Sequence, residues 1–278
     1  MMEIMRKAQP ILAILYDFDG TIASGNMQEH DFIPKTNTTT DDFWLESDTL
    51  ALEQNADNNL AYMRIMLEKA QKIGKTRKDF IACGKNIRFF KGVLEWFDRI
   101  NAYGKKIGVK VEHYLLSSGL HEIVEGTPIY KKFKKVYACR FMYNENNEAC
   151  WPAQVVNYTT KTQYLFRINK GCLEECDKSV NNRMNPEDRS IPFSRMLYIG
   201  DGLTDIPCMA TLKEFGGHAL AVYTPHKKGN KKIAKQLLAD GRVDTIAPAD
   251  YTEGSPLDLY VKALLKKAKA DYDFEKSL

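Results

Sequence analysis

Short apolar runs alternate along the chain with longer stretches in which apolar residues recur at helical spacing. The first run, Ile11 to Tyr16, is apolar at nearly every position, which is typical of a strand buried on both faces of a sheet. Further runs follow at His113 to Leu116, Met196 to Ile199 and Ala219 to Tyr223. Between them, helical spacing predicts amphipathic helices, such as the one from Val93 to Gly104. The alternation predicts an α/β fold with a Rossmann-like, three-layer core, in which helices cover both faces of a parallel sheet.

The stretch between the first two strands contains no convincing strand of its own. Asn26 to Asp42 is polar and reads as a loop, whereas Asp41 to Gly74 carries apolar residues at helical spacing. We therefore predict a core made of residues 1–22 and 91–278, interrupted by a small helical domain at residues 23–90.

The second half of the chain adds a hairpin and further helices to this plan. Lys135 to Tyr143 and Ala149 to Val156 read as two strands joined by an Asn-rich turn. Thr162 to Asn169 has a helical pattern, and Cys172 to Pro192 is charged and Asn-rich, which indicates a loop. A last helix is expected from Leu257 onward.

Composition narrows the classes of partner. Apolar residues make up 44% of the 278 positions and charged residues 27%, as in ordinary globular proteins. The net charge of +4 comes without the dense basic face that nucleic-acid binding requires. No apolar stretch is as long as a membrane span, and the run at Ile11 to Tyr16 is too short for a signal peptide. We expect a cytoplasmic protein that binds neither nucleic acid nor membrane, and the sequence leaves its oligomeric state open.

Polar residues gather where the predicted strands end. Three such ends are residues 17–21 (DFDGT), 117–119 (SSG) and 200–205 (GDGLTD). Because the carboxyl ends of parallel strands face one crevice, these segments are expected to share a site. The carboxylates gathered there would repel one another, and a divalent cation would relieve the repulsion. Oxygen ligands without His or Cys favour Mg²⁺ over zinc.

The same segments, in order and together with the lysine of Thr160-Lys161-Thr162, resemble the four motifs of the haloacid dehalogenase superfamily. The resemblance spans nearly the whole chain, from Ile11 to about Leu265, and is weakest in the helical stretch. A helical insert between the first and second motifs resembles the cap of phosphoserine phosphatases. The resemblance implies a phosphatase with a Rossmann-like core and a small helical cap at residues 23–90.

The resemblance also implies roles for residues of the first two motifs. Asp17 corresponds to the nucleophile that becomes an acyl phosphate. Asp19 corresponds to the general acid, which later acts as the general base, and its main-chain carbonyl would bind the metal. Ser118 and the Gly119 that follows it correspond to the phosphate-binding pair of the second motif, and Ser117 is the rival of Ser118 for that role.

Two further motif positions complete the implied site. Lys161 corresponds to the cation that neutralises charge on the phosphoryl oxygens, with Lys170 as a weaker rival. Asp201 corresponds to a metal ligand, and Asp205 either holds a metal-bound water or orients the lysine. The residues implied to hold Mg²⁺ are Asp17, Asp19, Asp201 and Asp205.

We therefore predict a Mg²⁺-dependent phosphomonoester hydrolase that acts on a small phosphorylated metabolite through an aspartyl-phosphate. A phosphotransferase or mutase using the same intermediate is an alternative, and so is a non-catalytic sensor of a phosphorylated ligand. Dehalogenation is disfavoured because the dehalogenases of this superfamily lack the acid that Asp19 supplies. Candidate substrate contacts in the insert are Glu29, Arg64, Arg77 and Arg88, although a solvated helix face is the simpler interpretation of each.

Overall fold

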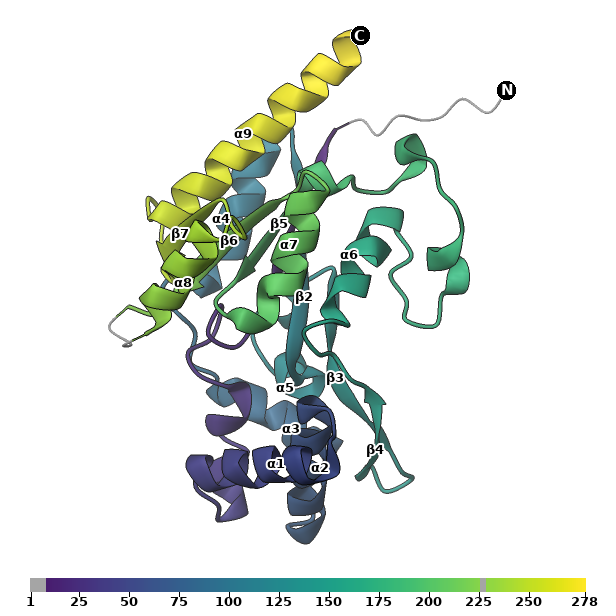
Figure 1. Ribbon diagram of the computed structural model, residues 1–278, viewed down its shortest axis with the longest axis vertical. Coiled ribbons are helices and arrows are strands. Elements are labelled where there is room, and N and C mark those ends of the chain that lie inside the picture. The colour runs from purple at the N-terminus through teal and green to yellow at the C-terminus, as the bar shows by residue number, and fades with distance from the viewer. Residues whose placement is uncertain (1–8, 226–228) are drawn as a thin grey trace.

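A seven-stranded sheet organises the molecule (Figure 1), which is a computed structural model that describes residues 9–225 and 229–278. Residues 1–8 of the predicted core lie outside this range. The strands are β1 (Ile11–Tyr16), β2 (Lys110–Leu120), β3 (Lys135–Tyr143), β4 (Ala149–Gln154), β5 (Met196–Gly200), β6 (His218–Tyr223) and β7 (Thr245–Pro248). Their order is β4-β3-β2-β1-β5-β6-β7, and all neighbours are parallel except β3 and β4, which form an antiparallel hairpin. The predicted parallel sheet is confirmed.

Helices cover both faces of this sheet. They are α1 (Thr40–Gln54), α2 (Asn58–Lys72), α3 (Arg77–Cys83), α4 (Val93–Lys106), α5 (His121–Glu125), α6 (Lys161–Lys170), α7 (Ile206–Glu214), α8 (Asn230–Ala239) and α9 (Pro256–Ser277). Helices α4 and α9 pack together on one face, whereas α6 and α7 pack together on the other (Figure 1). The three-layer α/β arrangement is therefore as predicted. Within the described ranges, no helix is both long and apolar enough to cross a membrane.

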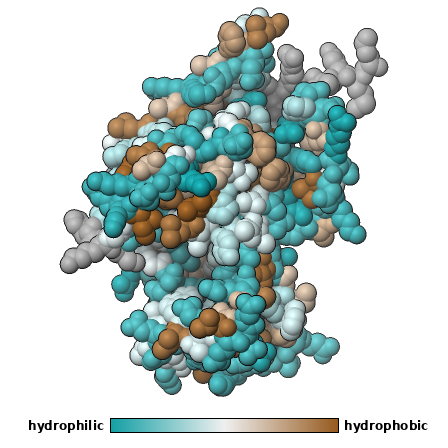
Figure 2. Space-filling view, in the orientation of Figure 1, coloured by the Kyte–Doolittle hydropathy of each residue, from teal (hydrophilic) through white to brown (hydrophobic). Residues whose placement is uncertain are grey.

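The helical segment, residues 23–90, lies beyond the carboxyl ends of the strands and forms a lobe of its own in Figure 2. The predicted helix over 41–74 is two helices, because Asn55 adopts a left-handed conformation that ends α1 and Asp57 caps α2. The stretch 26–42, predicted as a polar loop, contains two 3₁₀ turns, at Met27–Glu29 and Ile33–Thr36. Met27 and Ile33 are fully buried, so the stretch is packed against the molecule.

A chain of buried hydrogen bonds holds the central strand against α4 and β2. The Trp96 indole N–H donates to the Tyr16 hydroxyl at 2.8 Å, and this hydroxyl lies 2.9 Å from Nδ1 of His113. Nε2 of His113 lies 3.1 Å from Oδ1 of Asn101, which can only accept, so the ring carries its proton on Nε2. The network thus fixes the backbone directly before Asp17 and is complete with a neutral imidazole.

One predicted strand end is wrong, at residues 117–119. Ser117, Ser118 and Gly119 do not leave the sheet, because β2 continues through them to Leu120, where it still pairs with Cys139 of β3 after an irregularity in the register. The apolar run ends at Leu116, but the backbone pairing does not. Sequence hydropathy reports which side chains are buried and says nothing about pairing through polar residues, so the strand end was placed too early.

Candidate active site

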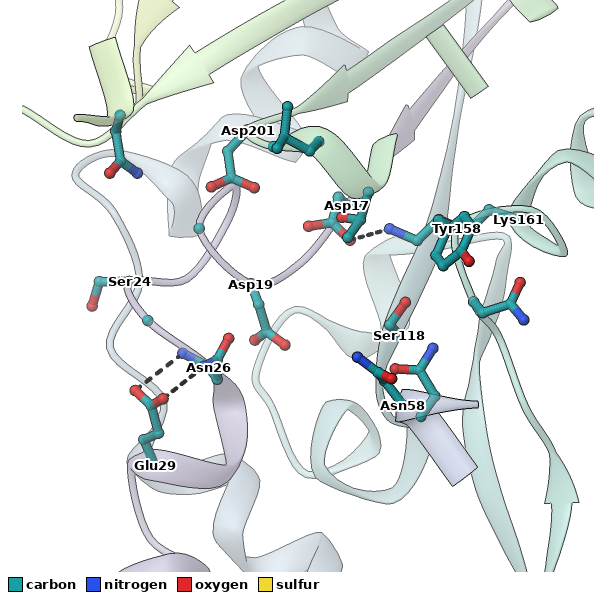
Figure 3. Close-up of a pocket in the computed structure, with 18 of the residues that line it drawn as sticks. Asp17, Asp19, Ser24, Asn26, Glu29, Asn58, Ser118, Tyr158, Lys161 and Asp201 are labelled. Carbon is teal, nitrogen blue, oxygen red and sulfur yellow. Dashed lines mark hydrogen bonds and ion pairs between the residues drawn. The ribbon is translucent and has the colours of Figure 1, made fainter. Parts of the chain in front are cut away.

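A cavity of about 880 Å³ lies at the carboxyl ends of β1, β2 and β5, between the sheet and the helical segment (Figure 3). The three strand ends that the sequence singled out do converge on it, as the parallel topology requires. The predicted site residues that line this cavity are Asp17, Asp19, Ser118, Lys161 and Asp201.

The backbone turns sharply after β1 to bring its two carboxylates to the cavity. The carbonyl of Phe18 accepts hydrogen bonds from the N–H groups of residues 21, 22 and 23, which closes a tight loop. Gly20 has φ +75°, and a Cβ there would overlap the Asp201 carboxylate. Glycine at position 20 therefore allows the first and fourth motifs to approach each other.

Lys161 links the first and fourth motifs through charge. Its Nζ donates to Oδ1 of Asp17 at 2.7 Å and to Oδ1 of Asp205 at 2.9 Å. The lysine is 1% exposed and Asp205 is fully buried, so solvent screens these ion pairs weakly. Burial alone would lower the pKa of Lys161, but attraction to the two carboxylates outweighs it and raises the pKa. The ammonium is therefore held charged beside Asp17.

Asp205 holds this arrangement in place from behind. In addition to Lys161, its Oδ1 accepts the Tyr198 hydroxyl at 2.7 Å. Its Oδ2 accepts the backbone N–H groups of Asp201 and Gly202 at 3.2 and 3.3 Å. With both oxygens engaged in this way, the geometry favours the role of orienting the lysine over that of holding a water.

A cluster of three carboxylates lies next to these ion pairs. Carboxylate oxygens of Asp17, Asp201 and Asp205 approach within 4.8 Å of one another, and all are hard donors of the kind that Mg²⁺ prefers. The Asp19 carboxylate points elsewhere, since its Oδ1 accepts the N–H of Met27 at 2.8 Å. A direct contribution of Asp19 to a metal would therefore come from its main chain, as the resemblance implies.

The electrostatics show why a cation suits this cluster. Burial, opposed by Lys161, raises the pKa of Asp17 to about 6. Burial and repulsion from Asp17 and Asp205 raise the pKa of Asp201 to about 8. Burial, and then the charge of Asp17, also hold the pKa of Asp19 well above its ordinary value. Without a cation the Asp201 carboxyl would hold a proton at neutral pH, and a divalent ion would favour the ionised forms of the cluster.

The alternative residues for the phosphate-binding serine and for the lysine lie in different places in the structure. Ser118 lines the cavity, whereas the Ser117 hydroxyl is buried and accepts the Gly119 N–H at 2.9 Å. Gly119 is not among the described residues that line the cavity. The Lys170 ammonium donates to the backbone carbonyls of Val180 and Asn182, outside the site.

Of the candidate substrate contacts, only Glu29 is among the described residues that line the cavity. Arg64 pairs with Glu68, and Arg77 pairs with Glu125. Sequence reasoning missed Asn58, Tyr158, Tyr198 and Met27. Tyr198 lies in an apolar run and reads as core, and Met27 acts through its backbone, so neither carried a signal.

The fold and this clustering of motif residues are those of a phosphatase, and they resemble the haloacid dehalogenase superfamily. The family described as Putative Phosphatase matches residues 12–220, and the chain belongs to that family. An uncharacterized protein of Borreliella burgdorferi is 30% identical over 281 residues, covering 91% of this chain and 96% of the relative.

Solved structures support the fold. A HAD family hydrolase of Salmonella enterica serovar Typhi superposes with a TM-score of 0.59 at 14% identity, covering 92% of this chain and 72% of its own. A structure described as a phospho-aspartyl intermediate analogue of phosphoserine phosphatase superposes with a TM-score of 0.53 at 17% identity, covering 92% of this chain and 99% of its own. At these identities the likeness is one of fold.

Proposed function

We propose that this phosphatase is a Mg²⁺-dependent phosphomonoester hydrolase that acts on a small phosphorylated metabolite through an aspartyl-phosphate on Asp17. The observation that carries the proposal is the Lys161 ammonium, which bridges Asp17 and Asp205 beside the cluster formed with Asp201. The buried Lys161 ammonium lies next to the buried Asp17 carboxylate in the wall of the cavity. This arrangement suits a reaction in which negative charge develops on phosphoryl oxygens.

The residues support a two-step reaction. Lys161 engages Oδ1 of Asp17, which leaves Oδ2 to attack phosphorus as the bond to the ester oxygen breaks. Asp19, whose pKa is raised by burial and by the charge of Asp17, gives its proton to the departing alkoxide. The resulting Asp19 carboxylate then takes a proton from the water that attacks the phosphorus, which releases phosphate and regenerates Asp17. The phosphoserine phosphatase structure reported above is described as containing an analogue of a phospho-aspartyl intermediate.

Magnesium fits the oxygen donors at the strand ends. Asp17 and Asp201 would hold it through their carboxylates and Asp19 through its main-chain carbonyl, while Asp205 orients Lys161. When bound, Mg²⁺ supplies positive charge for the phosphoryl oxygens and for the crowded carboxylates. Ser118, at the cavity wall, is placed to donate its hydroxyl to the phosphate group.

We propose that the helical segment serves as the cap over this site and that residues 1–22 and 91–278 form the core domain. The segment supplies one wall of the cavity, including Glu29 and Asn58. The Tyr62 hydroxyl donates to the carbonyl of Ser118 at 2.7 Å, which ties the wall to the phosphate-binding strand. A wall of this kind excludes bulk water during phosphoryl transfer and selects the leaving group. The cytoplasmic location predicted from the sequence stays a prediction.

Trapping the intermediate tests the proposal. The enzyme is mixed with p-nitrophenyl phosphate and Mg²⁺, quenched, and reduced with borohydride, which converts an acyl phosphate to the alcohol. We expect mass spectrometry to find homoserine at position 17 and nowhere else, and EDTA to abolish both turnover and labelling. Turnover without homoserine at position 17 would overturn the covalent mechanism. Transfer of phosphate to added alcohols in preference to water would identify a phosphotransferase, and no turnover on a broad panel of phosphate esters would favour a sensor.

A further inference from the structure

One backbone group sets the direction of the Asp19 carboxyl. The N–H of Met27 donates to Oδ1 of Asp19 at 2.8 Å, and no other residue in the described ranges makes a hydrogen bond to this carboxyl. In Figure 3, Asp19 projects from the end of β1 toward the segment that carries Asn26. The proposed general acid is therefore held by the first turn of the helical segment, eight residues further along the chain.

Met27 is itself immobilised from two sides. Its side chain is fully buried, and its Sδ accepts the N–H of Leu120 at 3.1 Å. Its backbone begins the 3₁₀ turn Met27–Glu29, where the Asn26 side chain donates to Glu29 at 2.6 Å. The Glu29 carboxylate also accepts the Trp44 indole N–H at 2.9 Å, which ties the turn to α1.

Gly119 keeps open the space in which Met27 and Asp19 meet. A Cβ at position 119 would overlap the end of the Met27 side chain and would lie 3.2 Å from Oδ2 of Asp19. The second oxygen of the carboxyl thus lies on the side of β2, the strand that also carries Ser118 to the cavity. This explains why the second motif ends in glycine although Gly119 does not line the cavity.

We propose, resting on the role of Asp19 given above, that the Met27 backbone N–H is the positioning group for the general acid. The carbonyl oxygen of a protonated carboxyl accepts an N–H better than the hydroxyl oxygen does, so the bond from Met27 to Oδ1 favours the carboxyl proton on Oδ2. Met27 thereby presents the proton from one defined oxygen to the departing alkoxide. Because this donor belongs to the helical segment, proton delivery is correct only when that segment is seated on β2.

A proline at position 27 removes the backbone N–H that binds Asp19, and the local backbone can accept it. Position 27 is the first residue of its turn, where proline is well tolerated, and Asn26 before it is extended (φ −87°, ψ 140°), as a residue before proline should be. Met27→Ala is the matched control, because it loses the same side chain but keeps the N–H. Comparing the two variants isolates the hydrogen bond to Asp19.

The readout is the dependence of rate on the leaving group. A p-nitrophenolate departs without a proton, whereas the alkoxide of glycerol phosphate needs one. We expect Met27→Pro to lower the single-turnover rate of aspartyl-phosphate formation from glycerol phosphate about 10- to 100-fold relative to Met27→Ala. For p-nitrophenyl phosphate the rate of this first step should differ less than about threefold between the two variants, since p-nitrophenolate departs without the acid. A purely structural defect would slow both substrates alike.

Equal rates for Met27→Pro and Met27→Ala on both substrates would overturn the proposal. If Met27→Pro does not fold, a backbone ester at position 27, made with the α-hydroxy analogue of methionine, removes the N–H and keeps the side chain; the same comparison with wild type then decides. Asp19→Asn separates this proposal from the function on which it rests. Slower formation of the aspartyl-phosphate from glycerol phosphate alone in Asp19→Asn confirms the acid, whereas equally slow formation from both substrates would refute that role of Asp19.

Discussion

The two walls of the cavity are built differently. On the sheet side, Asp17, Lys161 and Asp205 are buried, and ion pairs connect all three. On the outer rim, which we define as Asn58 and Tyr158, the side chains are uncharged, and neither side chain makes a hydrogen bond within the described residues. Tyr158 is 55% exposed, whereas Lys161 is 1% exposed. The chemistry is therefore fixed by mutual contacts, and the rim is free to adjust to a leaving group.

This difference predicts unequal tolerance to substitution. A buried ion pair that loses one partner leaves an uncompensated charge, which is costly. An exposed amide or phenol that is lost is replaced by water at little cost. The rim can therefore change between relatives without disturbing phosphoryl transfer, and each prediction below tests one wall against the other.

Replacing the nucleophile should give the largest effect. Asp17→Asn should lower kcat on p-nitrophenyl phosphate by about 10⁴-fold or more, because an amide does not form an acyl phosphate. Circular dichroism should show an intact fold. Asp57→Asn is the matched control elsewhere in the cavity lining, since asparagine also caps helices, and it should stay within a few-fold of wild type. Comparable activity in the two variants would contradict the proposed nucleophile.

Removing the buried cation should come next. Lys161→Met should lower kcat about 10²- to 10³-fold through lost charge stabilisation. It should also reduce the free energy of unfolding by about 3–5 kcal/mol, since Asp17 and Asp205 would stay buried without their partner. Lys170→Met should leave kcat unchanged, because the Lys170 ammonium donates to the backbone carbonyls of Val180 and Asn182, away from the site. Steady-state kinetics and urea unfolding measure both effects, and a reversed result would make Lys170 the lysine of the third motif.

A group on the sheet side should also make the free energy of unfolding depend on pH, whereas the rim residues Asn58 and Tyr158 should not. Burial lowers the pKa of His113 from 6.5 to about 3 in the native state. Below pH 6.5 the unfolded chain binds a proton that the native state refuses, so native stability falls as the pH drops toward 3. Between pH 7.5 and pH 5 this single group should cost about 2 kcal/mol of unfolding free energy.

Urea unfolding of wild type and His113→Gln at several pH values tests this contribution. The variant should lose the part of the pH dependence that His113 supplies, while its stability at pH 7.5 reports the lost contacts to Tyr16 and Asn101. Parallel pH curves for the two proteins would show that His113 is not the group responsible.

Substitutions on the rim should have the smallest effects. Asn58→Ala and Tyr158→Phe each remove one neutral hydrogen-bonding group and should change kcat/KM about two- to tenfold. The change should differ between substrates with different alcohols and should leave trapping of homoserine at position 17 intact. A loss as large as that of Lys161→Met would refute the contrast between the two walls.

The sequence predicted the sheet side well because its signals are strong there. Asp17, Asp19 and Asp201 directly follow apolar runs, and parallel topology brings such strand ends together. Lys161 was found only through the resemblance, since a lone lysine before a helix normally reads as solvated. Asn58, at the start of α2, has no signal at all, because an uncharged residue at a helix end is ordinary.

Other hydrogen bonds of the site could not be predicted from the sequence, because hydropathy carries no information about them. Tyr198 lies within an apolar strand, yet its hydroxyl supports Asp205. The stretch 26–42 looked like a polar loop, but it packs Met27 into the core and sends its backbone N–H to Asp19. Polar composition hides such contacts, since backbone groups are the same in every residue except proline.

The attachment of the helical segment to the hairpin has a consequence for traffic through the cavity. Gln71 donates to the carbonyl of Ala149, Asn59 to that of Val156, and the N–H of Arg77 to the carbonyl of Asn147. Lifting the whole segment would break these bonds together, and the two connections of the segment to the core are themselves paired at Ala23 and Phe89. We therefore expect the segment to stay seated during turnover, with metabolite arriving and phosphate departing through the cavity as it stands.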